Sequence, residues 1–461
     1  MTTSAELLVD AVLAMPGQLP NDISQNARLH LLDAIGVGLA AAAVGPVRSL
    51  PHATSFSAGP CTVIGSSLRR DAADAALLNG TLIHSIEFDD THTGSVMHGS
   101  STLAPAVLAA AEEAGAEGTT ALRAFVVGWE VIIRLGLAAP SGFQRNGFQG
   151  TSIAGTIAGA LAVGLIQGLD RVELVNAVGI AASYSAGNFS FLSEGASVKA
   201  AQPGIAAQGA ISAVRLARGG VTGASGVLDG RNGLFSIYAS DESASGRFRD
   251  SLASLGCEWL IADAAFKEFP CCHFIHPFIE AVGRSQLDFS SAAEIAGIRC
   301  RVPAGQEAII ATPWEQKQSP VTAAEGRWSL PYALAVRLVN GDVTVSDFDG
   351  PADPRVVEIA HRISWELWDD SPYPERFPAE VELTLNDSSS ETVSVPDANG
   401  NRTRPWRRGE VLTKFFANAE LAGLTEPERQ RFVDAFLDGG TIDLDVFADL
   451  VAPTRHEQTV D

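Results

Sequence analysis

Hydrophobic and polar residues along the first 240 positions follow the pattern of long helices. The segments there are rich in alanine and leucine, show little β-branched alternation, and several end in glycine, as helices commonly do. Because they are apolar around most of their circumference, we expect them at the centre of a large helical bundle. The predicted helices cover residues 27–43, 72–88, 102–115, 121–138, 171–187 and 204–220.

The pattern changes at about residue 265. Residues 293–303 and 379–400 alternate apolar and polar positions, as strands do, and turn residues stand at Asn386-Asp387 and Asn399-Gly400-Asn401. Helical periodicity continues at 329–341, 354–367, 409–423 and 426–440.

This order of segments predicts a mainly α protein with two parts. We expect a large all-helical domain, formed by residues 1–264 together with 405–461, and a smaller α+β lid domain formed by residues 265–404. A chain of 461 residues is too long for one ordinary core, which agrees with two domains.

Composition narrows the class of partner. The net charge of −22 argues against nucleic acid or an anionic membrane, since no basic field is available to meet phosphates. The apolar run 152–166 is shorter than the roughly 20 residues that a membrane span requires, and residues 1–18 read as an ordinary first helix. Five cysteines without a paired framework favour a reducing, cytoplasmic location.

Titratable side chains gather in residues 88–111, FDDTHTGSVMHGSSTLAPAVLAAA, directly ahead of an apolar helix. Asp89 and Asp90 are expected to end one helix, His98 precedes the next, and Ser100 or its neighbour can cap it. A helix N-terminus suits a carboxylate, and an Asp–His set can hold a general acid or base. The plainer alternative is that the aspartates only cap backbone and that His92 is exposed.

Two further stretches of the helical part carry candidate residues. In FQGTSIAGTIAG (148–159), a loop turns into a helix beside Gln149 and Thr151, although capping alone would explain that composition. Lys199 is the only lysine in the first 260 residues and stands among small residues. Burial there would lower the pKa of its amine towards use as a base, or the amine would pair with a carboxylate.

The stretch KEFPCCHFIHPFIEA (267–281) combines cysteines and histidines. A zinc site is one interpretation, but adjacent cysteines do not fit the usual C-x₂₋₄-C ligand spacing. Cys272 could be a nucleophile, whereas free cysteines are more often buried in cores. His276 is a candidate acid, base or substrate contact. We predict no metal site.

Four stretches together resemble the MmgE/PrpD family through nearly the whole chain. They are NGTLIHSIEFDDTHTGSVMHGSSTLAPAVLA, SVKAAQPGIAAQGAISAVRLARGGVTGASGVLDGRNGLF, FPCCHFIHPFIEA and RWSLPYALAVRLVNGDVT. The family includes 2-methylcitrate dehydratase, cis-aconitate decarboxylase and iminodisuccinate epimerase. The resemblance implies a cofactor-free homodimer with a cleft between a helical domain and an α+β lid.

The resemblance also implies site residues, since Asp90, His98, Lys199, His276 and Tyr332 match positions that line the cleft in relatives. Lys199 and His98 would transfer protons, Asp90 would orient a histidine, and His276 with helix N-termini would hold carboxylates. The residues expected to bind substrate are Asp89, His92, Ser100, Gln149, Thr151, Gln202, Cys272, His273 and Tyr332.

Two departures separate this chain from the family pattern. Gln149 stands where relatives usually carry histidine in a GFH-x-T loop, and Gln202 stands where they often read Lys-x-x-His-x-Gly. Glutamine can bind a carboxylate but does not titrate near pH 7.

Three functions remain open from the sequence, and all of them involve a small polycarboxylate. The first is a lyase that removes a proton next to a carboxylate, most simply a dehydratase for a 2-methylcitrate-like tricarboxylate. Decarboxylation of cis-aconitate is a variant of this lyase chemistry. The second function is an epimerase of an amino- or imino-dicarboxylate, which needs only two proton carriers. The third is a protein that binds carboxylates without catalysis.

Overall fold

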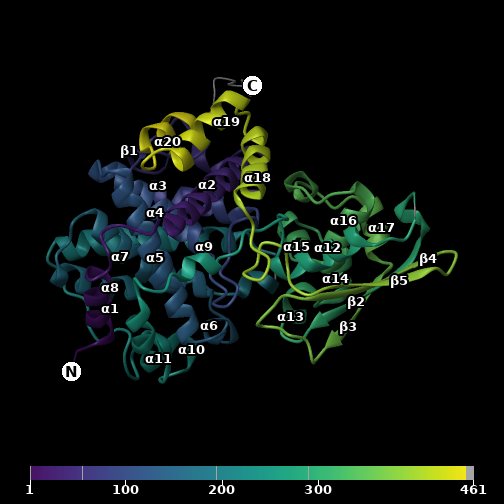
Figure 1. Cartoon of the computed structure of the whole chain (residues 1–461), viewed down its shortest axis with the longest axis horizontal. Coiled ribbons are helices and arrows are strands. Elements are labelled where there is room, and N and C mark those ends of the chain that lie inside the picture. Colours follow the sequence, from purple (N-terminus) through teal and green to yellow (C-terminus); the bar gives the residue numbers. More distant parts are fainter. Residues whose placement is uncertain (1, 54, 194, 289, 453–461) are drawn as a thin grey trace.

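The computed structural model describes residues 2–452 except 54, 194 and 289. Figure 1 shows a large lobe of helices beside a smaller lobe in which helices lie against a sheet. The predicted fold class, mainly α with a smaller α+β domain, is confirmed.

The larger domain is a bundle whose central helices pack at close range. An added Cβ at Gly80 would lie 2.7 Å from the Cα of Gly204, so only glycine allows α3 and α9 to approach this closely. This crossing brings the end of α3 next to the start of α9. The elements are α1 (Ser4–Leu13), α2 (Asn21–Val44), β1 (Ala58–Cys61), α3 (Ala72–Ser85), α4 (Gly99–Ala114), α5 (Gly118–Ala138), α6 (Gly142–Arg145), α7 (Gly150–Ile166), α8 (Arg171–Tyr184), α9 (Val198–Arg218), α10 (Leu234–Ala239) and α11 (Ala244–Ser251).

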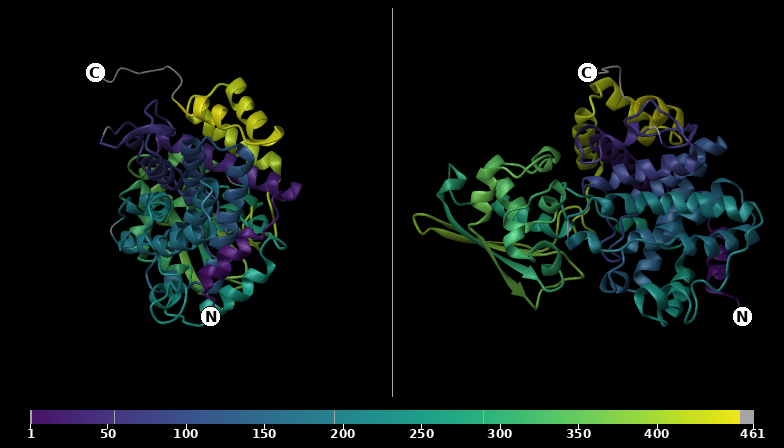
Figure 2. Two further views of the ribbon diagram at one scale, coloured as in Figure 1. Left: turned by 90° about the vertical axis from the view of Figure 1, so that its left-hand side faces the viewer. Right: turned by 180° about the vertical axis from the view of Figure 1, so that it is seen from behind.

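The C-terminal helices return to this domain, as Figures 1 and 2 show in yellow. They are α18 (Arg408–Leu421), α19 (Glu426–Val433) and α20 (Leu444–Leu450). α18 packs on α2, where a Cβ at Gly36 would meet the ring of Phe415 at 2.8 Å.

Helix α2 is long and apolar enough to cross a membrane by length and composition, with a mean hydropathy of 1.5 in its most apolar window. However, 78% of that window is buried inside the protein. A core helix of a water-soluble protein has the same character, so this single helix is weak support for a membrane span.

The smaller domain is built on a four-stranded sheet in the order β3-β2-β4-β5. β2 runs parallel to β3 and antiparallel to β4, and β4 and β5 form a hairpin. α12 packs on one face of the sheet, next to α16. The elements are α12 (His276–Arg284), β2 (Ile295–Pro303), α13 (Glu307–Ile310), α14 (Trp314–Gln318), α15 (Ala323–Arg327), α16 (Leu330–Asn340), α17 (Pro354–Ala360), β3 (Ile363–Trp368), β4 (Ala379–Leu385) and β5 (Ser390–Val395).

One predicted helix of this domain is wrong in its second half. Residues 354–367 were expected to be helical throughout, but α17 ends at Ala360 and the chain continues as strand β3. Ile363 to Trp368 pair in register with Ile298 to Pro303 of β2. Pairing with a strand that is distant in sequence therefore overrides the local helical pattern.

Two separate hydrophobic cores lie beneath these elements. One is formed almost entirely by residues 5–264 and 415–451, the other by residues 269–398. The chain crosses between the domains at residues 265–268 and again near 399–407, and Lys267 lies on the first crossing.

Candidate active site

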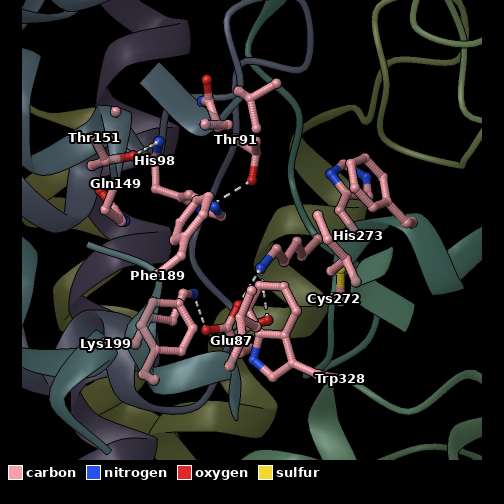
Figure 3. A pocket seen from close by; sticks show the side chains of 18 of the residues that line it. Glu87, Thr91, His98, Gln149, Thr151, Phe189, Lys199, Cys272, His273 and Trp328 are labelled. Carbon is pink, nitrogen blue, oxygen red and sulfur yellow. Dashed lines mark hydrogen bonds and ion pairs between the residues drawn. The ribbon is translucent and has the colours of Figure 1, made fainter. Parts of the chain in front are cut away.

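A cavity opens between the two domains, and Figure 3 shows side chains that line it. This interdomain cavity holds about 730 Å³ of empty space, part of which is open to solvent. The larger domain contributes the loops before α4 and α7 and the start of α9, and the smaller domain closes the other side. Its lining residues with polar or aromatic chemistry include Glu87, Thr91, His98, Gln149, Thr151, Phe189, Lys199, Lys267, Cys272, His273 and Trp328.

Two lysines meet one carboxylate in this cavity. The ammonium of Lys199 contacts Glu87 Oε1, and Nζ of Lys267 lies 3.5 Å from Glu87 Oε2 and 2.9 Å from the Glu87 carbonyl oxygen. All three side chains are buried. From the smaller domain, the ring of Trp328 lies 4.7 Å from Nζ of Lys199, a cation–π contact that covers the amine.

Burial and charge act differently on these three groups. Burial would raise the pKa of Glu87, but Lys199 and Lys267 lower it to about 2. Burial lowers the pKa of Lys199, and Glu87 offsets this only in part. Burial also opposes the charge on Lys267, yet its pKa is raised because Glu87 and Asp89 outweigh that effect. Lys199 is therefore the amine of the pair that gives up a proton more easily, and Lys267 stays a fixed cation.

A second set of titratable groups is centred on Asp89. Its Oδ2 lies 2.7 Å from Nδ1 of His84 and 3.4 Å from Nδ1 of His98. Nδ1 of His98 also lies 3.1 Å from the hydroxyl of Thr91. The side chain of His98 is 14% exposed, at the cavity wall, whereas His84 and Asp89 are fully buried. Because the carboxylate engages Nδ1, Nε2 of His98 is the nitrogen left for a substrate.

The N-terminus of α7 meets the same wall. The side-chain oxygen of Gln149 accepts a hydrogen bond of 2.8 Å from Ser152 N–H, so Gln149 caps the helix. The hydroxyl of Thr151 accepts a 2.9 Å hydrogen bond from the His98 N–H. α7 thus fixes the backbone of His98, and Gln149 supplies a neutral amide rather than a proton carrier.

Cys272 and His273 lie on the smaller domain's side of the cavity. Burial raises the pKa of the Cys272 thiol to about 11, which leaves it a neutral thiol and a poor nucleophile. Burial holds the pKa of His273 well below its usual value, and neither ring nitrogen has a hydrogen-bond partner among the described residues. A neutral imidazole at this wall can donate one hydrogen bond and accept another.

The structure places Asp90 and Ser100 behind the cavity wall, not on it. Asp90 Oδ2 lies 2.7 Å from Nδ1 of His30, a buried residue that the sequence analysis did not single out, and accepts a 2.5 Å hydrogen bond from the Ser100 hydroxyl. Asp89, one position earlier, is the carboxylate that contacts His98. The two aspartates also do not end a helix, because α3 stops at Ser85, and the Ser100 side chain serves Asp90 and does not cap α4.

Five other expected site residues also lie off the cavity wall. One is Asp89, which is fully buried and meets the cavity only through its contact with His98. Nε2 of His276 faces the Cys271 carbonyl at 3.3 Å, and Tyr332 packs against Phe348 in the smaller domain's core. His92 is buried rather than exposed, with Nδ1 2.8 Å from the Ser95 hydroxyl.

Gln202 acts on the cavity only through a loop. Its side-chain amide donates a 2.8 Å hydrogen bond to the carbonyl of Asn188, whose neighbour Phe189 lines the cavity. Six of the expected residues thus line the interdomain cavity: His98, Gln149, Thr151, Lys199, Cys272 and His273.

Sequence reasoning missed Glu87, Lys267 and His84. The chain has only four lysines, so the argument from rarity that selected Lys199 applied equally to Lys267. Glu87 gave no such signal, because glutamate is common in this chain. Its backbone φ of 53°, which is unusual for a residue other than glycine, is seen only in the folded structure.

His84, Asp89 and His98 also form the kind of cluster that can bind a metal ion. Their potential ligand atoms lie within 4.8 Å of one another. Two imidazoles and a carboxylate are common ligands of divalent metals. The hydrogen bonds already described use the Nδ1 atoms and the same carboxylate, so a bound ion would have to replace them.

Buried histidines predict a loss of stability in mild acid. Burial lowers the pKa of His84 and His92 to about 4 and holds the pKa values of His273 and His276 well below the usual range. Each contribution is therefore complete above the unfolded value of about 6.5 and is lost as the pH falls, at about 1.4 kcal/mol per pH unit per histidine. We expect the Tm to drop steeply between pH 6.5 and 5 in calorimetry.

A matched pair of variants separates these histidines from other groups. His92→Gln should flatten that dependence, whereas His361→Gln, at an exposed position, should not change it. A Tm that stays constant from pH 6.5 to 5 would contradict the prediction.

Comparison with known proteins matches most of the chain to one family. Residues 12–246 match the MmgE/PrpD N-terminal domain, and residues 269–438 match the MmgE/PrpD C-terminal domain. A cis-aconitate decarboxylase of Aspergillus terreus is 28% identical over 449 residues, which cover 91% of this chain and 89% of that protein. The cis-aconitate decarboxylase of Homo sapiens is 28% identical over 426 residues, or 87% of this chain and 85% of that protein. The two domain matches cover most of the chain, which therefore belongs to the MmgE/PrpD family.

Proposed function

We propose that this protein is a lyase that acts on a small tricarboxylate without a cofactor, and that cis-aconitate is the first substrate to test. The observation that carries the proposal is the pairing of Lys199, an amine with a lowered pKa, with the Asp89–His98 set in one interdomain cavity. The curated relatives named cis-aconitate decarboxylase support the choice of substrate.

Decarboxylation needs two things that this cavity offers. When the carbon–carbon bond to one carboxylate breaks, CO₂ leaves and its electron pair stays on the carbon skeleton until a proton replaces it. Lys267 is a fixed cation that can stabilise the developing charge, and Lys199 or His98 can deliver the proton to carbon. The proton donor is then restored from solvent.

Dehydration of a 2-methylcitrate-like substrate would use the same groups in another order. A base removes the proton next to a carboxylate, the β carbon–oxygen bond breaks, and an acid protonates the departing hydroxide to give water. Lys199 and His98 are the candidates for base and acid in this reaction.

Epimerisation is the second candidate, and Gln149 is the observation that favours it. Gln149 caps α7 with its side-chain amide, and an amide cannot carry a proton. We therefore assign proton transfer to His98 and Lys199, which line the same wall. Two carriers are enough to remove a proton from a dicarboxylate and return one.

Proton NMR in deuterated water separates these functions. The protein is incubated with cis-aconitate, 2-methylcitrate, citrate and iminodisuccinate in turn, with heat-denatured protein as the control. We expect cis-aconitate to lose CO₂ and to gain one deuterium on carbon. A new alkene from 2-methylcitrate would favour the dehydratase, and deuterium exchange without net conversion would favour the epimerase. No conversion or exchange of any compound would overturn the proposal.

We further predict that activity does not depend on a metal ion. The reason is that the Nδ1 atoms of His84 and His98 already share the carboxylate of Asp89. Protein dialysed against EDTA and assayed in metal-free buffer should keep its kcat within about twofold. The prediction fails if activity disappears and returns with one divalent ion, since the three residues would then be ligands.

A further inference from the structure

A second chamber adjoins the interdomain cavity and shares Glu87, Lys199 and Trp328 with it. The larger domain contributes the C-terminal end of α3 and the start of α9 to this chamber, and the smaller domain contributes residues of α14 and α15. The residues that matter here are His84, Lys199, Lys317, Glu325, Arg327 and Trp328.

Arg327 is a buried cation for which the described part of the chain offers no hydrogen-bond acceptor. It is 1% exposed, and none of its three side-chain nitrogens has a hydrogen-bond partner among the described residues. Its guanidinium carbon lies 5.3 Å from the ring of Phe348. Burial lowers its pKa to about 10, so it still carries its charge at neutral pH. Burying a charge without a partner destabilises a folded protein, so its presence here calls for an explanation.

Another equally buried arginine shows how this chain normally satisfies such a group. Arg134, also 1% exposed, pairs with the carboxylate of Glu130 and donates to the carbonyl oxygens of Ser251 and Glu258 at 3.2 Å each. Among the described residues, no carboxylate hydrogen-bonds to Arg327. The contrast indicates that its guanidinium is reserved for a group that the protein does not itself supply.

The remaining charges of the chamber leave it positive. Lys199 is neutralised by Glu87, whereas Nζ of Lys317 donates to the carbonyl oxygens of Ile309 and Trp328, which carry no charge. The carboxylate of Glu325 caps its own helix by accepting from the N–H groups at positions 321 and 322. Because the protein carries a net charge of −22, a locally positive chamber is a place where an anion can bind.

We propose that the second chamber binds a carboxylate through Arg327. A guanidinium matches a carboxylate with two parallel hydrogen bonds. His84 lines the same chamber, and its Nδ1 faces Asp89. Its Nε2, which has no hydrogen-bond partner among the described residues, can accept a hydrogen bond from a hydroxyl or water of the ligand. The carboxylate comes either from the far end of the molecule that reacts at Lys199 or from a separate anion, and only the first of these rests on the proposed function.

Calorimetric titration with tricarballylate tests the site without turnover, because this saturated tricarboxylate has no double bond or hydroxyl to react. We expect Arg327→Gln to weaken binding on the order of 10- to 100-fold, as the loss of a charge-assisted contact predicts. Arg327→Lys keeps the charge but loses the paired geometry, and should fall in between. The control is Arg355→Gln, at a 74% exposed position of α17, which should bind as the wild type does.

Thermal unfolding separates a binding role from a structural one. Removing an unpaired buried charge should leave the Tm of the ligand-free Arg327→Gln variant equal to or above that of the wild type, while the rise in Tm caused by tricarballylate is lost. The backbone carbonyl of Arg327, which accepts from Cys272 N–H at 2.9 Å, is unchanged by the substitution. A lowered Tm together with an unchanged ligand-induced rise would overturn the proposal, as would wild-type affinity of Arg327→Gln for both tricarballylate and acetate.

Competition identifies the source of the carboxylate. If it belongs to the substrate, tricarballylate binds once per chain and acetate competes with it. If the site takes a separate anion, acetate binds in an Arg327-dependent manner without displacing tricarballylate. Binding that depends on Arg327, in a protein that converts none of the compounds in the NMR panel, would sustain this site and remove the proposed lyase function. If the Arg327→Gln variant instead converts substrate and binds anions as the wild type does, the lyase function is sustained and the proposed site is removed.

Discussion

Replacing Lys199 by alanine is expected to lower kcat by on the order of 10²–10⁴, the range found when a general acid or base is lost. Lys199 is buried against Glu87 and covered by Trp328, and burial lowers its pKa. An amine in this position gives up a proton more easily than an exposed lysine does. Steady-state kinetics on whichever compound the NMR panel identifies provides the measurement.

Lys199→Arg is the matched variant, because it keeps a cation beside Glu87 but does not release a proton. We expect it to retain much of the substrate affinity, seen as a similar KM, and little of the turnover. Normal turnover in Lys199→Arg would reduce the lysine to an electrostatic anchor, and His98 would then carry the chemistry. Normal turnover in Lys199→Ala would remove Lys199 from the mechanism.

The helical framework around this lysine could be predicted from the sequence because its signals are local. The apolar periodicity of α7 and α9 and the alternation in β4 and β5 are written into consecutive residues. Strand β3 could not be predicted in this way, since Ile363 to Trp368 become a strand by pairing with β2, about 65 residues earlier in the chain. The boundary between a helix and such a strand depends on tertiary structure.

Site prediction failed where neighbouring residues face different directions. Asp89 and Asp90 are adjacent in a loop, and nothing in their spacing tells which of them faces His98. Glu87 begins this loop with a φ of 53°, so the chain turns in a way that periodicity does not report. The same limit applies to Arg327, because its distinguishing property is the absence of an acidic partner, and partners become visible only in the folded chain.

The sequence predicted Lys199 as a site residue but did not predict its partner Glu87. The rarity of lysine and the small neighbours of Lys199 indicated a buried amine, and the structure places it at the cavity wall. Its carboxylate partner lies 112 positions earlier in the chain, and the second lysine that shares this partner lies 180 positions from it. The crossing of α3 and α9 brings Lys199 to Glu87, and the segment that links the two domains brings Lys267 to the same residue.

The two adjacent aspartates allow a prediction with an internal control. Asp89→Asn is expected to lower kcat by on the order of 10²–10³, because an amide does not hold His98 as a carboxylate does and does not stabilise its protonated form. As Asp89 acts through His98, the pH profile of kcat/KM should change as well.

Asp90→Asn makes the same chemical change one residue later and should give the opposite result. Asp90 bonds to His30 and Ser100 behind the wall, so its replacement should lower the free energy of unfolding by about 1–3 kcal/mol through buried groups that lose a partner. The folded fraction should turn over within about threefold of the wild type, with an unshifted pH profile. If Asp90→Asn is instead the variant that loses turnover and shifts the profile, the carboxylate that orients the catalytic histidine is Asp90, and the role assigned to Asp89 is wrong.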